Sequence, residues 1–395
     1  MTTATLNSEK KKAQVPKLRF SGFEGEWKEI LLEDFATRGS GHTPSKSYPE
    51  YYNGDINWIS LTDSKKLDNG YIEFTNTKIT QLGLDNSSAV LHPAGSVLLS
   101  RDAGVGKSAV MKHSMAVSQH FIVWTAKENV SSNWFLYNVL QILKPEFERI
   151  AIGNTIKTIG LPYFKKLKIT APAFKEQQKI ASFLSAVDEK IQQLSRKKEL
   201  LEQYKKGIMQ QLFSSKLRFK DENGNDYPNW EEKKLGDVAT KKSSNISANK
   251  IEDNFGDFII YGASGILKKV DFYKEESDYI SIVKDGAGVG RLLYCKGKSS
   301  VLGTMEIISP KQNIDTYFLY CLLSNIDFVK YVTGSTIPHI YFKDYSSEIC
   351  GIPSLREQQK IAHFLSGIDS KIEQVNGELV KTQEFKKGLL QQMFV

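Results

Sequence analysis

The stretch FKEQQKIASFLSAVDEKIQQLSRKKELLEQYKKGIMQQLF, residues 174–213, decides the fold because the chain contains it twice. Residues 355–394 read LREQQKIAHFLSGIDSKIEQVNGELVKTQEFKKGLLQQMF. The two copies align without a gap over 40 positions, of which 19 are identical. The chain is therefore a tandem duplication, a feature that determines how every other segment is interpreted.

Shorter matches extend the repeat beyond these two segments. KLRF occurs at 17–20 and 216–219, AGVGK at 103–107 resembles AGVGR at 287–291, and GNTIKTI at 153–159 resembles GSTIPHI at 334–340. Each unit thus has a divergent part of roughly 140–160 residues, the size of a domain, followed by a strongly repeated part. We predict five segments: a disordered N-terminus at 1–15, a first domain at 16–173, a helical segment at 174–213, a second domain at 214–353 and a second helical segment at 354–395.

Both repeated segments are predicted to be long helices. Their apolar residues alternate in steps of four and three, which is typical of a coiled coil. We expect the two helices, each about 60 Å long, to pair antiparallel with the divergent domains at opposite ends. Ordinary amphipathic helices in a single core are the alternative. The predicted pairing residues are Ile180, Leu184, Val187, Ile191, Leu194, Leu201, Ile361, Leu365, Ile368, Ile372, Val375 and Leu379.

Two further features of these segments carry predictions. Ser354 precedes the second helix and Glu357 follows three residues later, a pattern that predicts a capping box. Gly207 and Gly388 lie within the helices, where glycine costs about 1 kcal/mol relative to alanine. Their presence in both copies predicts a close helix crossing or contact with a partner.

The divergent parts are predicted to be mostly β domains with some helix. Short runs rich in Val, Ile, Tyr, Phe and Trp, separated by turn residues, favour strands. Helical patterns occur at 132–143 and 315–325. The predicted strands are 56–61, 96–100, 120–124, 258–262, 279–283 and 305–309.

Composition narrows the class of protein. The chain has 53 basic and 45 acidic residues, a net charge of +8, which permits nucleic-acid binding without requiring it. Its three cysteines form no CxxC pair and its six histidines are scattered, which argues against a zinc site or a disulfide framework and favours a reducing cytoplasm. The polar N-terminus does not resemble a signal peptide, and no apolar run is long enough to span a membrane.

The stretch RDAGVGKSAV at 101–110 raises the question of nucleotide binding. A phosphate-binding loop of the Walker A type needs a glycine five residues before the Gly-Lys-Ser, and here Arg101 occupies that position. The second copy continues AGVG with Arg291 and has no Lys-Ser. A glycine turn between two strands explains both copies, and an NTP-dependent enzyme using residues 103–108 is the alternative.

The pattern EQQKIAxFLSxxDxKI followed by KKGxxQQxF, present twice and each time after a divergent domain, resembles the specificity subunit of type I restriction-modification enzymes. The resemblance extends from about residue 16 to the end of the chain. GHTPSKSYPEYYNGDINWIS at 41–60 resembles the start of a target-recognition domain of that family. The second unit departs from this start, with KKSSNISANK at 241–250 instead.

The resemblance implies an α+β protein with two target-recognition domains separated by two long antiparallel helices, a pseudo-two-fold tandem repeat. Each domain would read one half of a bipartite double-stranded DNA target, and the helices would set the spacer and dock modification subunits, two of them being expected. The chain would have no catalysis, cofactor or metal of its own. S-adenosylmethionine, ATP and Mg would bind the partner subunits, which include motor-nuclease restriction subunits in this bacterial defence system. A coiled-coil scaffold that binds only protein is a further alternative.

Candidate contact residues follow from charge, polarity and position in loops. In the first domain the DNA-binding candidates are Arg38, Thr43, Ser45, Lys46, Tyr51, Arg101, Lys107, Asn154 and Lys157. In the second they are Lys241, Lys242, Lys284, Arg291, Ser335 and Thr336. Polar residues kept in both helices are predicted to contact the partner subunits, because helix pairing alone would not preserve them. They are Gln177, Gln178, Lys205, Lys206, Gln210, Gln211, Gln358, Gln359, Lys386, Lys387, Gln391 and Gln392.

Overall fold

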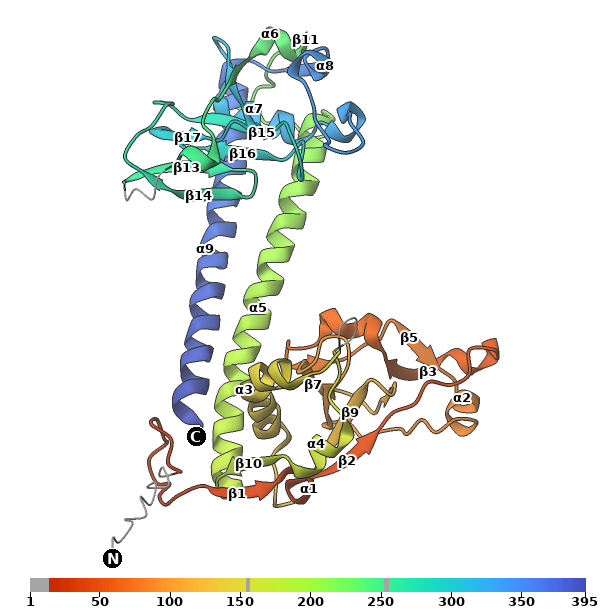
Figure 1. Ribbon diagram of the computed structural model, residues 1–395. Coiled ribbons are helices and arrows are strands. Elements are labelled where there is room, and N and C mark those ends of the chain that lie inside the picture. The colour runs from red at the N-terminus through yellow and green to blue at the C-terminus, as the bar shows by residue number, and fades with distance from the viewer. Residues whose placement is uncertain (1–13, 154–156, 252–255) are drawn as a thin grey trace, which may run out of the picture. The chain divides into compact units, whose positions relative to one another are not determined.

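The computed structural model describes residues 14–153, 157–251 and 256–395. Nearly all of the N-terminal segment predicted to be disordered lies outside these ranges. The chain forms two compact units, one made of Met1–Arg196 with Asn376–Val395 and the other of Lys197–Val375. Each unit therefore combines one divergent domain with part of both long helices, which are labelled α5 and α9 in Figure 1.

The first unit contains a five-stranded sheet, a three-stranded sheet and a two-stranded ribbon. The five-stranded sheet has the order β2 (Ala36–Ser40), β9 (Phe121–Ala126), β6 (Val97–Ser100), β7 (Ser108–Met111) and β4 (Tyr71–Ile72). The three-stranded sheet has the order β5 (Thr77–Ile79), β3 (Tyr52–Ile59) and β8 (Ala116–Val117). The ribbon pairs β1 (Lys28–Leu31) with β10 (Lys168–Ala171). The helices are α1 (Leu32–Phe35), α2 (Gln81–Asp85), α3 (Asn133–Ile150) and α4 (Leu161–Lys166), with short 3-10 turns η1 (Pro49–Tyr51) and η2 (Leu61–Lys66).

The central sheet of this unit is buried on both faces, which explains why its strands are apolar without alternation. Val97 and Leu99 of β6 pack in one core with Phe135 of α3 and Leu184 of α5. Leu98, between them in sequence, packs on the other face in a second core with residues of β3 and β8. The sheet thus lies between a helical layer and the three-stranded sheet.

The second unit repeats this plan. Its four-stranded sheet has the order β12 (Ala239–Ser243), β18 (Met305–Pro310), β15 (Tyr279–Val283) and β16 (Leu292–Cys295), the three-stranded sheet has β14 (Gly265–Val270), β13 (Phe258–Gly262) and β17 (Ser299–Val301), and the ribbon pairs β11 (Glu231–Lys234) with β19 (Ile349–Ile352). Its helices are α6 (Leu235–Val238), α7 (Thr316–Ser324) and α8 (Phe342–Tyr345), with η3 (Ala248–Lys250) and η4 (Phe328–Tyr331). All six predicted strands and both predicted domain helices are confirmed.

The long helices run over Phe174–Phe213 (α5) and Leu355–Met393 (α9), as predicted. In the first unit, Lys386 Nζ lies 2.6 Å from Asp188 Oδ1, and in the second, Lys205 Nζ lies 2.6 Å from Asp369 Oδ2. The helices are antiparallel, because the partner in α9 moves from 386 back to 369 as the position in α5 advances from 188 to 205.

The apolar stripe does more than pair the helices. Ile180 and Leu184 of α5 belong to the core of the first domain, and Ile361 and Leu365 of α9 belong to the core of the second. The start of each helix is therefore a layer of the adjoining divergent domain, as the single-core alternative supposed for the whole length. Further along, Leu194 and Val375 are buried, whereas Val187, Ile191, Leu201, Ile372 and Leu379 are half-buried.

One expectation about the helices is wrong. A Cβ added at Gly207 or Gly388 would have no neighbouring atom within 4 Å. No close crossing therefore requires glycine at these positions. Contact of these glycines with a partner stays a prediction.

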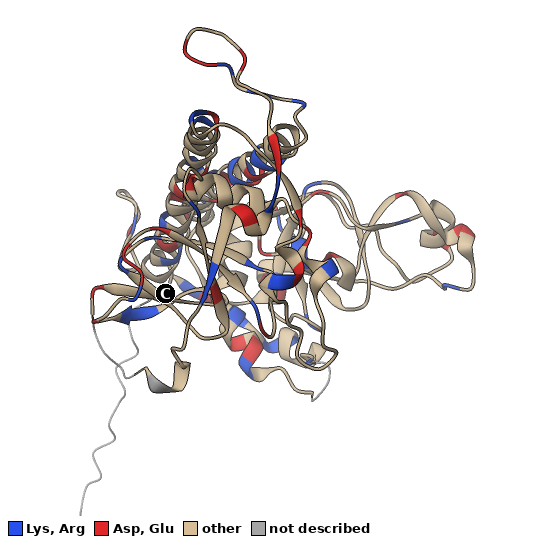
Figure 2. Ribbon diagram, turned by 90° about the horizontal axis from the view of Figure 1, so that it is seen from above, with Lys and Arg blue, Asp and Glu red and all other residues tan. Residues whose placement is uncertain are grey.

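The structure also shows where the cysteines and the charged residues lie. Cys295, Cys321 and Cys350 are free and buried. Basic and acidic residues are interspersed along the ribbon in Figure 2. Among the described residues, no helix has the length and apolar character to cross a membrane.

Candidate nucleic-acid interface

The stretch 101–107 forms a glycine turn between two antiparallel strands, β6 and β7. Gly106 N–H donates to Ser100 O at 2.9 Å, and Lys107 N–H donates to Gly104 O at 3.2 Å. Gly104 and Gly106 have φ values of 106° and 85°, which favour glycine. A strand follows the turn, whereas a Walker A loop opens a helix. The NTP-dependent alternative is therefore wrong in its structural premise.

The second unit contains the same turn between β15 and β16. Gly290 N–H donates to Val283 O at 2.8 Å, and Arg291 N–H donates to Gly288 O at 3.0 Å. Gly288 and Gly290 have φ values of 92° and 84°. The turn is thus a repeated structural element, as the sequence predicts.

A second repeated loop is bonded to each glycine turn. In the first unit, Ile159 N–H donates to Arg101 O at 3.0 Å, and in the second unit, Ile340 N–H donates to Lys284 O at 3.0 Å. The residues just before Ile340 form a hairpin closed by two hydrogen bonds between Thr333 and His339. We call the glycine turn with this bonded loop the turn module of each unit, residues 101–107 with 157–159 and residues 284–291 with 333–340.

The turn module of the first unit also brings together side chains that the sequence did not single out. The Asp102 carboxylate accepts a hydrogen bond from Thr158 Oγ1 and lies 2.9 Å from His120 Nδ1. Gln119 joins two predicted candidates, because Thr43 Oγ1 donates to its side chain at 2.6 Å and Arg101 Nε donates to its carbonyl at 3.2 Å. The sequence signals for this cluster were the pair Arg101-Asp102, which recurs as Lys284-Asp285, and the repeated segment that contains Thr158.

The other DNA-binding candidates are scattered. Three basic candidates lie beside carboxylates: Arg38 with Glu33, Lys241 with Glu306 and Lys242 with Glu275. The Tyr51 ring lies near that of Tyr48, with centroids 5.0 Å apart and the planes tilted by 31°. Ser45 and Lys46 are exposed, Lys157, Ser335 and Thr336 are exposed within the turn modules, and Asn154 lies outside the described residues. No contact with DNA is tested for any of them.

The first glutamine of each EQQ motif, Gln177 or Gln358, has an intramolecular role. Gln177 Nε2 donates to Val130 O and Pro172 O, both at 3.0 Å, and its Oε1 accepts from Ser132 N–H at 3.0 Å. Gln358 makes the matching bonds to Asn313 O and Pro353 O and from Asp315 N–H. Both glutamines are buried, so the prediction that they contact partner subunits is corrected. Each one fixes the start of a long helix to the start of a domain helix.

The glutamates of the same motifs bind the arginines of the KLRF segments. Arg19 Nε and Nη2 each lie 2.8 Å from the Glu176 carboxylate. In the second unit, Arg218 Nη2 lies 2.7 Å from Glu357 Oε2, which also accepts from Trp230 Nε1 at 3.1 Å. The predicted capping box is therefore only half formed: Glu357 N–H donates to Ser354 Oγ at 3.5 Å, but the carboxylate faces the arginine instead.

The remaining partner candidates divide into two groups. Lys205 and Lys386 form the ion pairs between the helices, and each also lies over a tyrosine ring of its domain helix, Tyr320 or Tyr137. Their repeated positions thus have an intramolecular explanation as well. The exposed candidates are Gln178, Lys206, Gln210, Gln211, Gln359, Lys387, Gln391 and Gln392.

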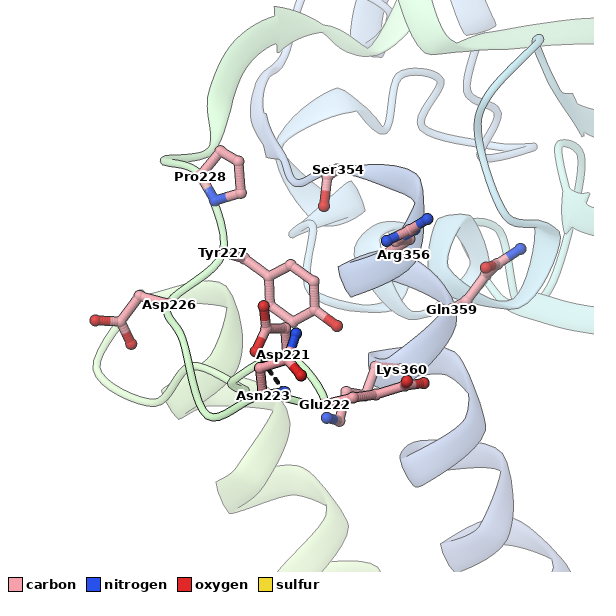
Figure 3. A pocket seen from close by; sticks show the side chains of 10 residues that line it. All are labelled: Asp221, Glu222, Asn223, Asp226, Tyr227, Pro228, Ser354, Arg356, Gln359 and Lys360. Carbon is pink, nitrogen blue, oxygen red and sulfur yellow. Dashed lines mark hydrogen bonds between the residues drawn. The ribbon is translucent and has the colours of Figure 1, made fainter.

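An open hollow lies beside the start of α9 in the second unit (Figure 3). Its wall includes Asp221 and Asp226 of the loop after KLRF, and Arg356, Gln359 and Lys360 of α9. Asp221 accepts hydrogen bonds from the backbone N–H groups of Asn223 and Asn225, and the bond from Asn225 is the main cause of its lowered pKa. No group of metal-ligating residues occurs there or elsewhere among the described residues.

The chain is similar to proteins of one class. A family model described as the type I restriction modification DNA specificity domain matches it twice, at residues 24–203 and 227–381. The Type I restriction enzyme MjaIX specificity subunit of Methanocaldococcus jannaschii is 24% identical over 396 residues, with 92% of each chain covered. The EcoprrI specificity subunit of Escherichia coli is 23% identical, with 88% of each covered. A crystal structure of a type I restriction-modification S subunit from M. genitalium shares the fold, with a TM-score of 0.68 at 19% identity over 96% of this chain and 99% of that one.

Proposed function

This chain belongs to the family of type I restriction-modification DNA specificity subunits, and we propose that its two domains each read one half of a bipartite DNA sequence. One observation carries the proposal: the two domains share the arrangement of their sheets but differ in one connection within the three-stranded sheet. The connection from β3 to β5 spans residues 60–76, whereas the equivalent connection from β13 to β14 is residues 263–264. Two domains with the same arrangement of sheets and a different connecting segment suit two half-sites of different sequence.

In this proposal the paired helices hold the domains apart, set the unspecified spacer and dock two modification subunits. The repeat places aromatic side chains at equivalent positions of the two units for this docking, all of them exposed except the half-buried Phe364. Phe183 and Phe385 line an apolar hollow in the first unit, and Phe364 and Tyr204 occupy the equivalent helix positions in the second. Equivalent surfaces suit two copies of one partner.

The chain itself would carry out no catalysis. Methylation with S-adenosylmethionine would take place on the modification subunits, and ATP- and Mg-dependent cleavage on restriction subunits joined through the complex, in the cytoplasm. This division leaves the chain to supply position and sequence recognition.

The test is methylation mapping of genomic DNA in cells with and without this chain. We expect an adenine motif of two specified halves around an unspecified spacer, present only when the chain is expressed together with its modification subunits. An identical methylation pattern in both cell lines would contradict the proposal and favour a scaffold that binds only protein.

A further inference from the structure

The turn module of each domain keeps the same set of hydrogen bonds in both units, although the two sequences around it differ. The bonds that close the glycine turn and the bond from the second loop recur at equivalent positions. Two half-sites of different base sequence still share one chemical feature, the sugar-phosphate backbone. A module kept in both domains is therefore matched to that shared feature.

Both turns have a basic residue at the same two positions, but arginine and lysine are exchanged between the two units. Arg101 in the first unit corresponds to Lys284 in the second, because each carbonyl accepts the bond from the second loop, and Lys107 corresponds to Arg291; Gly286 is one extra residue in the second turn. Arginine and lysine are not interchangeable where a guanidinium binds a base edge through two hydrogen bonds. They are interchangeable where only a positive charge beside a phosphate is needed.

At one of the two exchanged positions, both side chains are bonded to the protein's own backbone. Lys107 Nζ donates to Ser64 O at 3.1 Å, and Arg291 Nη1 donates to Ala263 O at 2.9 Å. Both acceptors follow the equivalent strands β3 and β13. This pair of cations therefore braces the turn against the three-stranded sheet.

The other position is partly exposed and makes fewer bonds to the protein. The side chains of Arg101 and Lys284 are 23% and 26% exposed, and each lies about 4 Å from the aspartate that follows it. Arg101 uses its Nε for Gln119 O, and a guanidinium has four further N–H donors. The tips of the turns, Ala103-Gly104 and Ala287-Gly288, are exposed and small, which allows a backbone to approach closely.

We propose that the turn modules hold the DNA backbone in both half-sites, with Arg101 and Lys284 as equivalent phosphate contacts, and that the bases are read by other parts of each domain. The inference rests on the proposed function and adds a division of labour within each domain. It predicts that these two residues contribute affinity without sequence preference.

The test measures binding of the full-length chain to a random-sequence duplex by fluorescence anisotropy over a series of salt concentrations. Arg101→Ala and Lys284→Ala should each lower the slope of log affinity against log salt by about one, and the double variant by about two. Arg101→Lys and Lys284→Arg should restore the wild-type slope. Lys190→Ala, which removes an exposed charge from α5, should leave the slope unchanged.

A second readout separates phosphate contact from base reading. The wild-type chain and each alanine variant are used to select bound sequences from a pool of randomised duplexes. The same selected sequence with a lower salt slope supports the inference. A changed base preference in one half-site, an unchanged slope, or loss of modification-subunit binding alone would overturn it. A wild-type chain whose affinity for duplexes falls with salt but which selects no split sequence would contradict the proposed function and not this inference. A chain that binds no duplex would overturn both.

Discussion

Insertion of seven residues into both long helices is expected to lengthen the spacer of the methylated motif by about three base pairs. Seven helical residues add about 10.5 Å at 1.5 Å per residue, and one base pair occupies about 3.4 Å along the duplex. Seven residues also preserve the period of the apolar stripe. The insertions belong between Arg196 and Lys197 in α5 and between Gly377 and Glu378 in α9, which are paired positions in the register set by the two ion pairs.

Insertion into one helix alone is the matched control. It shifts one half of that helix against its partner, so either the Asp188–Lys386 pair or the Asp369–Lys205 pair is lost. This variant should lose methylation rather than change the spacer. Methylation mapping reads both outcomes, and a doubly inserted chain with the wild-type spacer would contradict the role of the helices as a ruler.

Removal of the Glu357 carboxylate is expected to destabilise the second unit by about 2–4 kcal/mol. The carboxylate is fully buried and accepts hydrogen bonds from Arg218 and Trp230. Glu357→Ala leaves both donors without this acceptor, and breaking one side of a buried ion pair typically costs about 3–5 kcal/mol. The loss expected for this pair is smaller because the Arg218 side chain is 24% exposed and solvent screens its charge.

The midpoint of urea unfolding, followed by tryptophan fluorescence, measures this loss. The double variant Glu357→Met with Arg218→Met should recover much of it, because no charge is then left unpaired. Glu373→Ala, which removes an exposed carboxylate from the same helix, should change stability by less than about 0.5 kcal/mol. A Glu357→Ala loss no greater than that of Glu373→Ala would contradict the structural role of the motif.

The two long helices, the two domain helices and six of the strands were predictable because their signals are local. The apolar stripe and the repeat predicted the limits of α5, Phe174–Phe213. Runs such as VLLS and YISIV predicted strands, and the structure buries these strands on both faces. The glycine turn was predictable because the second copy lacks the Lys-Ser pair that a phosphate-binding loop needs.

The role of the EQQ motif was not predictable from the repeat. A buried intramolecular bond and a contact with a partner both preserve a polar residue at one position, so the sequence does not distinguish them. The acceptors of Gln177 are backbone carbonyls at Val130 and Pro172, and carbonyls leave no trace in the sequence. Gln119 was missed for the same reason, because its backbone carbonyl is the group that accepts a hydrogen bond from Arg101 Nε.

Exchange of residues 16–173 for the corresponding domain of another family member, followed by methylation mapping, tests the central claim most directly. The account predicts a motif in which one half changes to the donor's sequence while the other half stays unchanged. A motif altered in both halves, or in neither, would contradict the assignment of one half-site to each domain.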